Sequence, residues 1–240
     1  RIKPLVEKAA ELGMPAIAMT DHGNTHGAYE FWKQSRAAGI KPIIGMEAYL
    51  APGSRQEKAK VRWADGGDDD VSGGGAFSHL TIWATDNASM NNLFRLSSEA
   101  YLSGYYFKPR IDRELLGQFG KGLIGTTGCP GGEVQTRLRL GQYEEALKTA
   151  GEFRDIFGKE NYFVEVMDHA LEIEKRVRDD LLRLAKELKL PLVGTNDLHY
   201  VHKEDSVAHE ALLCVQTGTN LDDPKRFRFE SQEFYLKGAS

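Results

Sequence analysis

The amino-acid sequence predicts an α/β fold in which short apolar strands alternate with helices around a barrel. Strand-like apolar segments begin near residues 16, 40, 79, 123, 162 and 192, and a helical or loop-like segment follows each of them. This alternation is typical of a (β/α) barrel with parallel strands. With 240 residues, 41% of them hydrophobic and 28% charged, the chain can bury one sizeable core as a single domain.

The segments between these strands carry the apolar spacing of three to four residues that indicates amphipathic helices. We expect helices at residues 3–12, 27–38, 87–102, 142–157, 171–188 and 207–215, and a short one that includes residues 137–140. Residues 53–77 differ, because they are polar and rich in glycine, and we expect a mobile surface loop there that could be removed at little cost in stability. Its acids, Asp68 to Asp70, could bind a cation, but a solvated loop is the simpler interpretation.

Composition excludes some classes of protein. A formal net charge of -4 argues against a chain that binds nucleic acid by bulk charge, although a net sum would not reveal a local basic groove. The two cysteines, Cys129 and Cys214, are expected to be thiols and not a disulfide. We find no apolar run of the roughly 20 residues that a membrane span needs and no signal peptide, so we expect a cytoplasmic protein. Because the chain opens on Arg1 and its last residues carry no terminating signal, we expect a piece of a longer protein.

Two of the predicted strands end in residues suited to chemistry. Apolar residues 17–19 run directly into Thr20, Asp21 and His22, and a Gly-Asn turn follows. The carboxyl ends of the strands are where barrel enzymes place their active sites. Asp197 and His199 follow the strand that begins near residue 192, and their spacing of two puts both on one face of an extended chain. Two such strand ends suggest a shared metal site.

Further candidate ligands come from the other strands. Glu47 is an acid inside an apolar strand and needs a partner, His79 begins a strand, and Cys129 lies in the turn after another. The complete candidate set is His22, Glu47, His79, Cys129, Asp197 and His199. Imidazole, carboxylate and thiolate together suit zinc, and carboxylates could bridge two or more ions for phosphoester hydrolysis. Taken singly, each imidazole is more often a hydrogen-bonded part of the scaffold, and the thiol a small buried apolar group.

Other candidates leave alternatives open. His169 is either a ligand or an anchor for the helix that follows it, whereas His26, His202 and His209 are expected at the surface, and Cys214 is expected to be an ordinary buried thiol. Residues 105–110 (YYFKPR) form an aromatic and basic patch that could contact DNA through Lys108 and Arg110. The alternative, which we favour, is that these aromatic residues pack the loop onto the barrel.

Four segments carry a resemblance to a known family. They are TDHGN at 20–24, GIKPIIGMEAY at 39–49, TGCPGGE at 127–133 and TNDLHY at 195–200. The sequence closely resembles the PHP (polymerase and histidinol phosphatase) domain at the N-terminus of bacterial replicative DNA polymerase III alpha subunits. The resemblance covers nearly the whole chain, with several motifs in the right order.

The resemblance implies a distorted seven-stranded (β/α) barrel of TIM type that holds up to three zinc or manganese ions, with the six candidate ligands on family ligand positions. It also implies that Asp21, next to a ligand, orients an imidazole or the local backbone. Residues 1–218 would form the PHP domain, and residues 219–240 would begin the connection to a polymerase core. The family's site takes a His-x-His pair from a first strand and an acid from the turn after it, and both would precede Arg1. We therefore expect one barrel strand to be missing from this chain.

The functional expectations follow from the same resemblance. The parent protein would be a DNA-directed DNA polymerase whose polymerase carboxylates lie outside this chain, with DNA and other replicase subunits as partners. The PHP domain would be either a metal-dependent 3′-5′ exonuclease or a metal-braced scaffold that docks those subunits without catalysis. An amidohydrolase is a third and weaker alternative, because no motif specific to its substrates is present.

Overall fold

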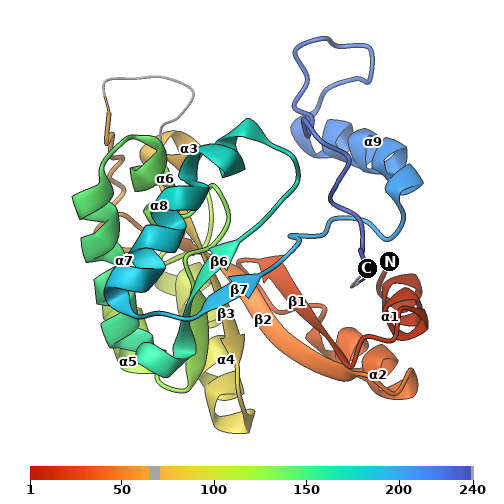
Figure 1. Cartoon of the computed structure of the whole chain (residues 1–240), viewed down its shortest axis with the longest axis horizontal. Helices are drawn as coiled ribbons and strands as arrows, with labels where there is room; N and C mark the ends of the chain where they lie inside the picture. The colour runs from red at the N-terminus through yellow and green to blue at the C-terminus, as the bar shows by residue number, and fades with distance from the viewer. Residues whose placement is uncertain (65–70, 239–240) are drawn as a thin grey trace.

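The computed structural model describes residues 1–64 and 71–238 and has a mixed α/β fold (Figure 1). The strands are β1 (Ala16–His22), β2 (Lys41–Leu50), β3 (Ser78–Ala84), β4 (Arg110–Ile111), β5 (Leu123–Thr126), β6 (Tyr162–Val166) and β7 (Leu192–Gly194). The helices are α1 (Ile2–Glu11), α2 (Ala28–Ala37), α3 (Ser72–Gly75), α4 (Asn87–Ser103), α5 (Arg113–Phe119), α6 (Glu133–Arg139), α7 (Tyr143–Phe157), α8 (Glu172–Leu188) and α9 (Ser206–Thr217). The predicted strand starts and long helices are confirmed to within about two residues, whereas β4 and α5 were not predicted.

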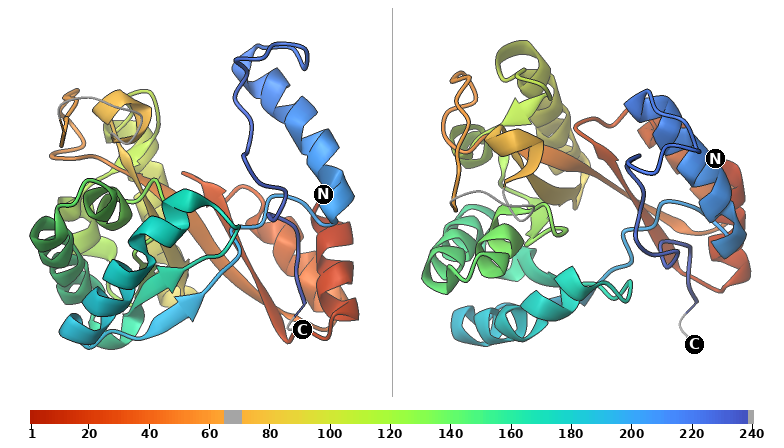
Figure 2. Two further views of the ribbon diagram at one scale, coloured as in Figure 1. Left: turned by 45° about the horizontal axis from the view of Figure 1, so that its top comes forward. Right: turned by 90° about the horizontal axis from the view of Figure 1, so that it is seen from above.

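The sheet has the order β1-β2-β3-β5-β6-β7, and β4 pairs with the end of β2 on the edge opposite to β3, beyond the last residue of β1. It curls, and helices pack on its outer side (Figure 2). Among the described strands, β1 and β7 are the two ends of this order, so the sheet is an open half-barrel. This confirms the predicted class, a distorted α/β barrel.

The expectation that all strands run parallel was wrong at β3, which is antiparallel to both β2 and β5. A parallel crossover needs a long connection that returns across the sheet, usually a helix. The connection from β2 to β3 contains only the four-residue helix α3 among its described residues. The chain therefore re-enters the sheet from the end at which β2 leaves it.

Two large apolar clusters of the described residues hold most of the fold. The larger lies between the sheet and helices α4 to α8 and includes Leu80, Ile82, Leu123, Phe153 and Leu184. The smaller packs α1 and α2 against β1 and also takes in Leu236 from the C-terminal segment. Cys214 is buried, and both cysteines are free thiols, as predicted. No helix in the described ranges is long and apolar enough to cross a membrane.

Residues 53–64 and 71–77, the described parts of the predicted loop, contradict the expectation that this loop could be removed at little cost in stability. Arg55 is buried in a salt bridge with Asp112, with Nη1 and Oδ2 3.1 Å apart. Val71, Ala76 and Phe77 are buried as well. The predicted acidic run Asp68 to Asp70 lies outside the described residues. Removing the whole segment would therefore break a buried ion pair and expose apolar surface.

Candidate metal centre

Strand pairing brings the first three candidate ligands together. The parallel register of β1 and β2 places His22 directly beside Glu47. On the other side of β2, the antiparallel register places His79 beside Tyr49, two residues from Glu47 and therefore on the same face. Donor atoms of His22, Glu47 and His79 all lie within 4.8 Å of one another. Three adjacent strands thus present two imidazoles and a carboxylate to one point.

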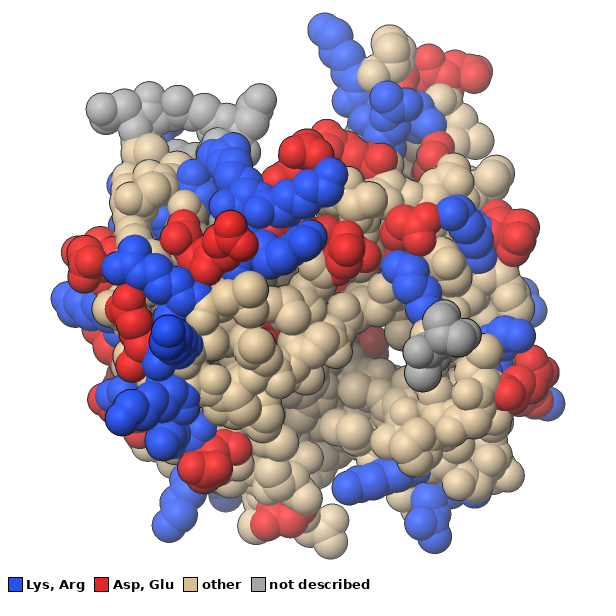
Figure 3. All heavy atoms as spheres, viewed as in Figure 1, with Lys and Arg blue, Asp and Glu red and all other residues tan. Residues whose placement is uncertain are grey.

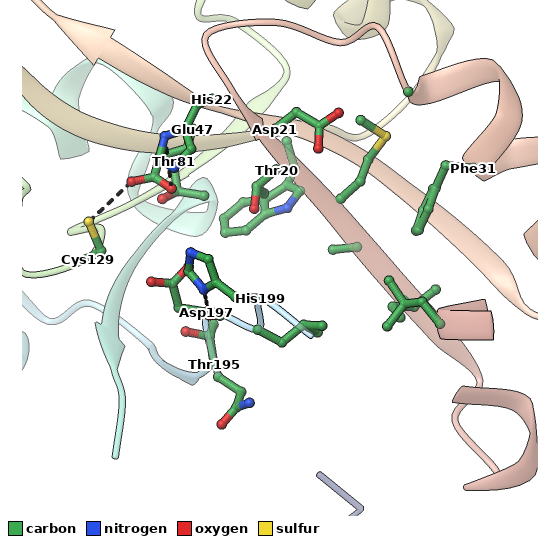
Figure 4. A pocket seen from close by; sticks show the side chains of 18 of the residues that line it. Thr20, Asp21, His22, Phe31, Glu47, Thr81, Cys129, Thr195, Asp197 and His199 are labelled. Atoms are coloured by element: carbon green, nitrogen blue, oxygen red, sulfur yellow. Dashed lines mark hydrogen bonds and ion pairs between the residues drawn. The ribbon is translucent and has the colours of Figure 1, made fainter. Parts of the chain in front are cut away.

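Cys129 joins this group from the turn after β5. Its Sγ lies 3.2 Å from Oε1 of Glu47 and 3.3 Å from Nδ1 of His79. The Glu47 carboxylate lies between the two imidazoles, with Oε1 2.6 Å from Nδ1 of His79 and Oε2 3.7 Å from Nδ1 of His22. Figure 4 shows the Cys129 sulfur pointing at Glu47 and His22 beside that carboxylate. The separations of 3.2, 3.3 and 3.7 Å are close to the roughly 3.3 to 3.8 Å expected between donors on one tetrahedral ion, whereas the 2.6 Å between Glu47 and His79 is the length of a short hydrogen bond.

The surroundings set the charges of the group. Burial raises the pKa of Glu47, but hydrogen bonding with His79 and the charges of His79 and His22 outweigh it and lower that pKa to about 2. Glu47 is therefore an anion at neutral pH. Burial and the charges of Glu47 and Asp197 raise the pKa of Cys129, so the thiol keeps its proton and donates its hydrogen bond to Glu47.

Asp197 and His199 reach the same cavity from the segment after β7. The cavity has a volume of about 470 Å³ and is also lined by His22, Glu47 and Cys129. Figure 4 shows Asp197 and His199 facing that cluster from the opposite side, and Figure 3 shows a hollow with mainly uncharged walls beside α1 and α2. Nδ1 of His199 donates to the carbonyl oxygen of Asp197 at 2.7 Å, which leaves Nε2 free to act as a ligand.

The backbone at Asp197 is strained, with a φ of 39° that side chains other than glycine rarely adopt. Such strain concentrates at functional sites, where surrounding contacts hold it in place. Here Asn196 donates from Nδ2 to the carbonyl oxygen of Tyr235 at 2.6 Å, and the His199 amide donates to the carbonyl oxygen of Phe234 at 2.8 Å. The C-terminal segment therefore holds both sides of the Asp197 turn.

The profile of the PHP domain matches residues 1–169. The chain belongs to the PHP domain family. It is 52% identical over its whole length to DNA polymerase III subunit alpha of Saccharopolyspora erythraea, and likewise 52% identical to that of Mycobacterium tuberculosis. The chain spans 21% and 20% of these proteins, about a fifth of their length. Among solved structures, this chain is similar to an amidohydrolase from Chromobacterium violaceum, with 13% sequence identity and a TM-score of 0.45. The match covers 80% of this chain and 82% of the amidohydrolase chain.

The remaining predicted residues of this PHP domain are less close to the cluster. Asp21 lies on the opposite side of β1 from His22, because neighbouring residues of a strand alternate in direction, and Figure 4 shows it pointing away from the other ligands. Its Oδ2 instead lies 3.0 Å from the position that a Cβ at Gly27 would occupy. The supporting role of Asp21 stays a prediction.

Glu165 on β6 is a cavity residue that was not predicted from the sequence. It is buried, and its carboxylate accepts hydrogen bonds from Thr126 Oγ1 and Thr195 Oγ1, each at 2.5 Å. Burial raises the pKa of Glu165. An acid inside the apolar strand 162–166 was the signal available, as it was for Glu47. Because its oxygens bond β5 and the segment after β7, Glu165 ties together the strands that carry Cys129 and Asp197.

The prediction for the DNA-contact residues needs a correction. Arg110 is 1% exposed and donates to the carbonyl oxygens of Gly104, Ala76, Arg55 and Glu57 at 2.8 to 3.1 Å. A side chain so enclosed does not reach DNA, so Arg110 is a structural residue. Lys108 is partly exposed, and its Nζ lies 5.6 Å from the centre of the Tyr49 ring. Its predicted role in contacting DNA stays open.

His169 anchors the helix that follows it, one of the two roles that its sequence position suggested. Glu174 of α8 accepts from the backbone N–H of His169 at 2.7 Å and lies 2.5 Å from Nδ1, while Nε2 lies 2.6 Å from the carbonyl oxygen of Asn196. Burial lowers the pKa of His169, but the hydrogen bond with Glu174, the Asn196 carbonyl and the charges of Glu174 and Asp197 raise it overall. The imidazolium thus bridges α8 to the turn that carries Asp197.

We expect this bridge to make folding stability depend on pH. Because its folded pKa is raised, His169 contributes fully below the unfolded value of about 6.5, and the contribution is lost as pH rises through the folded pKa. The pKa of Glu174 is lowered, since the bonds with His169 outweigh burial, so its own contribution is lost only under acid conditions. Thermal unfolding followed by circular dichroism should show this alkaline loss. His169→Gln should remove most of this dependence of stability on pH, whereas His26→Gln, at an exposed position, should leave it unchanged. If stability depended on pH in His169→Gln as it does in the unsubstituted protein, His169 would not be the group responsible.

Proposed function

We propose that this PHP domain is a metal-dependent phosphoesterase module of a bacterial DNA polymerase III alpha subunit, and that it removes nucleotides from the 3′ end of DNA. The observation that carries the proposal is the meeting of His22, Glu47, His79 and Cys129 at one point, with Asp197 and His199 across the same cavity. The 52% identity to two polymerase alpha subunits supports the polymerase assignment. DNA and the other replicase subunits are the partners that this function requires.

The donor set fits zinc or manganese. Two imidazoles, a carboxylate and the thiolate that Cys129 becomes when a metal displaces its proton are ligands that zinc accepts in tetrahedral sites, while the carboxylates also suit manganese. Asp197 and His199, on the opposite wall, are placed to serve a second ion. When bound, such ions act as Lewis acids that polarise a phosphoryl oxygen and make water more acidic.

The protein's own residues would orient the metal ligands and exclude water from the cavity. Glu47, an anion in contact with both imidazoles, sets their orientation and offsets part of the ions' charge. The His199 hydrogen bond to the Asp197 carbonyl fixes the tautomer that presents Nε2. Apolar side chains of Ile17, Met19 and Phe31 line the remainder of the cavity and limit the water around a bound phosphodiester.

A metal-braced scaffold without catalysis is the second candidate, and one observation favours it. The candidate ligands come from β1, β2 and β3 and from the segments after β5 and β7, which span the open sheet from one end to the other. Ions held there would join β1 to the segment after β7, at the two ends of the strand order, and their binding energy would add to folding stability.

Metal analysis and hydrolysis, measured together, separate the two candidates. We expect the full-length parent protein to contain zinc or manganese by plasma mass spectrometry and to shorten a 5′-labelled primer from its 3′ end. Asp197→Asn keeps the shape but removes the charge, and should slow hydrolysis by at least about 100-fold, whereas Asp168→Asn, at an exposed acid that follows β6, should leave it unchanged. Metal content and metal-dependent thermal stability without hydrolysis in the unsubstituted protein would instead support the scaffold.

A further inference from the structure

We propose that three exposed aromatic residues, Tyr101, Tyr105 and Phe107, with Lys60 and Lys108 beside them, form an aromatic platform that binds single-stranded nucleic acid. The platform would lead the 3′ end of that strand toward His22 and His79. This inference deepens the proposed function and rests on it for the identity of the strand. Its binding step, however, needs no bound metal and can be tested without hydrolysis.

The exposure of these rings is the first observation. Tyr101, Tyr105 and Phe107 are 44%, 58% and 57% exposed, and the ring centres of Tyr101 and Tyr105 are 6.3 Å apart. Tyr106, by contrast, packs against the buried cluster of Tyr49, Ala76 and Phe77. Tyr106 therefore fulfils the expectation that an aromatic residue holds this loop on the sheet. Tyr105 and Phe107 expose large apolar faces, which mark binding surfaces when they gather in one patch.

The backbone holds Phe107 outward at a cost in strain. Its φ is 61°, in a region that bulky side chains rarely adopt. Phe107 is the tip of a tight turn, because the amide of Tyr106 donates to the carbonyl oxygen of Lys108 at 3.0 Å. The enclosed guanidinium of Arg110 fixes the base of the same turn through the carbonyl oxygen of Gly104. A rigid ring loses little conformational freedom when a base stacks on it.

Positive charge accompanies the rings. Lys60 Nζ lies 4.8 Å from the centre of the Phe107 ring, and Lys108 Nζ lies 5.6 Å from that of Tyr49. Aromatic rings for bases beside ammonium groups for phosphates are the combination that binds single strands with little sequence preference. An exposed apolar patch that served only a protein partner would not require these cations.

Tyr49 connects the platform to the candidate metal centre. On the face next to the cluster, its ring stacks on that of His22 with centres 5.8 Å apart and an angle of 15° between planes, and it meets His79 edge-on at 5.5 Å. Lys108 lies over it from the loop, and Pro109 Cγ and Tyr49 Cδ2 lie 2.9 and 3.0 Å from the position that a Cβ at Gly23 would occupy. A phosphate held by Lys108 is thus separated from the ligand imidazoles by a single aromatic ring.

The test compares two pairs of exposed aromatic residues. Tyr105→Ala/Phe107→Ala removes rings of the platform, and Tyr29→Ala/Trp32→Ala removes a stacked, exposed pair on α2 as the matched control. Fluorescence anisotropy of a 5′-fluorescein oligodeoxythymidylate, measured with a chelator present, should show binding weakened at least about tenfold by the first change and unaltered by the second. Equal affinities in all three proteins, or equal losses in both variants, would overturn the platform.

Two further measurements remove ambiguity. Lys60→Gln/Lys108→Gln should lower the slope of log affinity against log salt by up to about 1.4, or about 0.7 for each phosphate that a lysine no longer neutralises. An unchanged slope would count against the platform even if the alanine variant failed to fold.

Hydrolysis of bis(p-nitrophenyl) phosphate, which is too small to need the platform, reports the proposed phosphoesterase function separately. Hydrolysis that survives in Tyr105→Ala/Phe107→Ala while oligonucleotide binding falls supports the platform. Absence of hydrolysis in every protein would refute the phosphoesterase and leave the binding result to decide the platform.

Discussion

Replacing Glu47 with glutamine should remove the metal from the protein and with it any hydrolysis of phosphoesters. Glu47 is the only acid within the close group of His22, His79 and Cys129, and its oxygens contact all three. Substitution of residues that merely support metal ligands typically costs 10 to 100-fold in affinity. Loss of a central carboxylate ligand should therefore cost more than about 100-fold, and hydrolysis should fall to the background of the assay.

The measurement is metal content after dialysis against a weak chelator, together with thermal unfolding with and without added zinc or manganese. Glu133→Gln is the matched control. Glu133, on α6, is also a buried acid, but its carboxylate forms an ion pair with Arg113, with Oε2 3.0 Å from Nη2. This variant should lower stability through the broken ion pair and still retain metal. Retention of a full complement of metal by Glu47→Gln would mean that the cluster is not the metal centre.

Sequence patterns predicted the positions of the strands well, because most strands are short runs rich in apolar residues, and some of these runs end in polar residues. The runs that end at His22 and at Thr126 behave in this way, and the structure places the candidate ligands that follow them around one cavity. Local pattern does not contain strand direction, however, which depends on the length of the connection and on what packs over the sheet. The antiparallel direction of β3 was therefore not predicted, and the two-residue strand β4 was missed altogether.

The errors about individual side chains share one cause, namely that tertiary contacts decide burial for long polar residues. Arg110 looked like a surface cation because arginine is seldom fully buried, yet backbone carbonyls from three separate segments surround it. Glu165 was overlooked, although it is an acid in an apolar strand just as Glu47 is, because its threonine partners come from β5 and from the segment after β7. A single sequence does not show which distant oxygens or hydroxyls will meet a given side chain.

The enclosure of Arg110 leads to the second large expected effect. Arg110→Met keeps much of the side chain's apolar length but leaves the carbonyl oxygens of Gly104, Ala76, Arg55 and Glu57 without their donor. Hydrogen bonds to charged groups contribute about 1.5 to 3 kcal/mol each, and a buried acceptor that is left without a donor costs about 1 to 3 kcal/mol. We expect a loss of about 3 to 5 kcal/mol in the free energy of unfolding, measured by urea denaturation. This is a large share of the roughly 5 to 15 kcal/mol that stabilises a typical domain.

Lys108→Met is the matched control, because it removes a partly exposed cation two residues away whose ammonium lies over the Tyr49 ring. It should change the free energy of unfolding by less than about 1 kcal/mol. The two variants also distinguish a residue that holds the loop in place from one that binds at its surface. Arg110→Met should lower stability and, by loosening the turn at Phe107, should also weaken the binding of an oligonucleotide. Lys108→Met should weaken oligonucleotide binding alone. If Arg110→Met were as stable as the unsubstituted protein, the guanidinium would not hold the loop, and the fixed outward position of Phe107 would need another explanation.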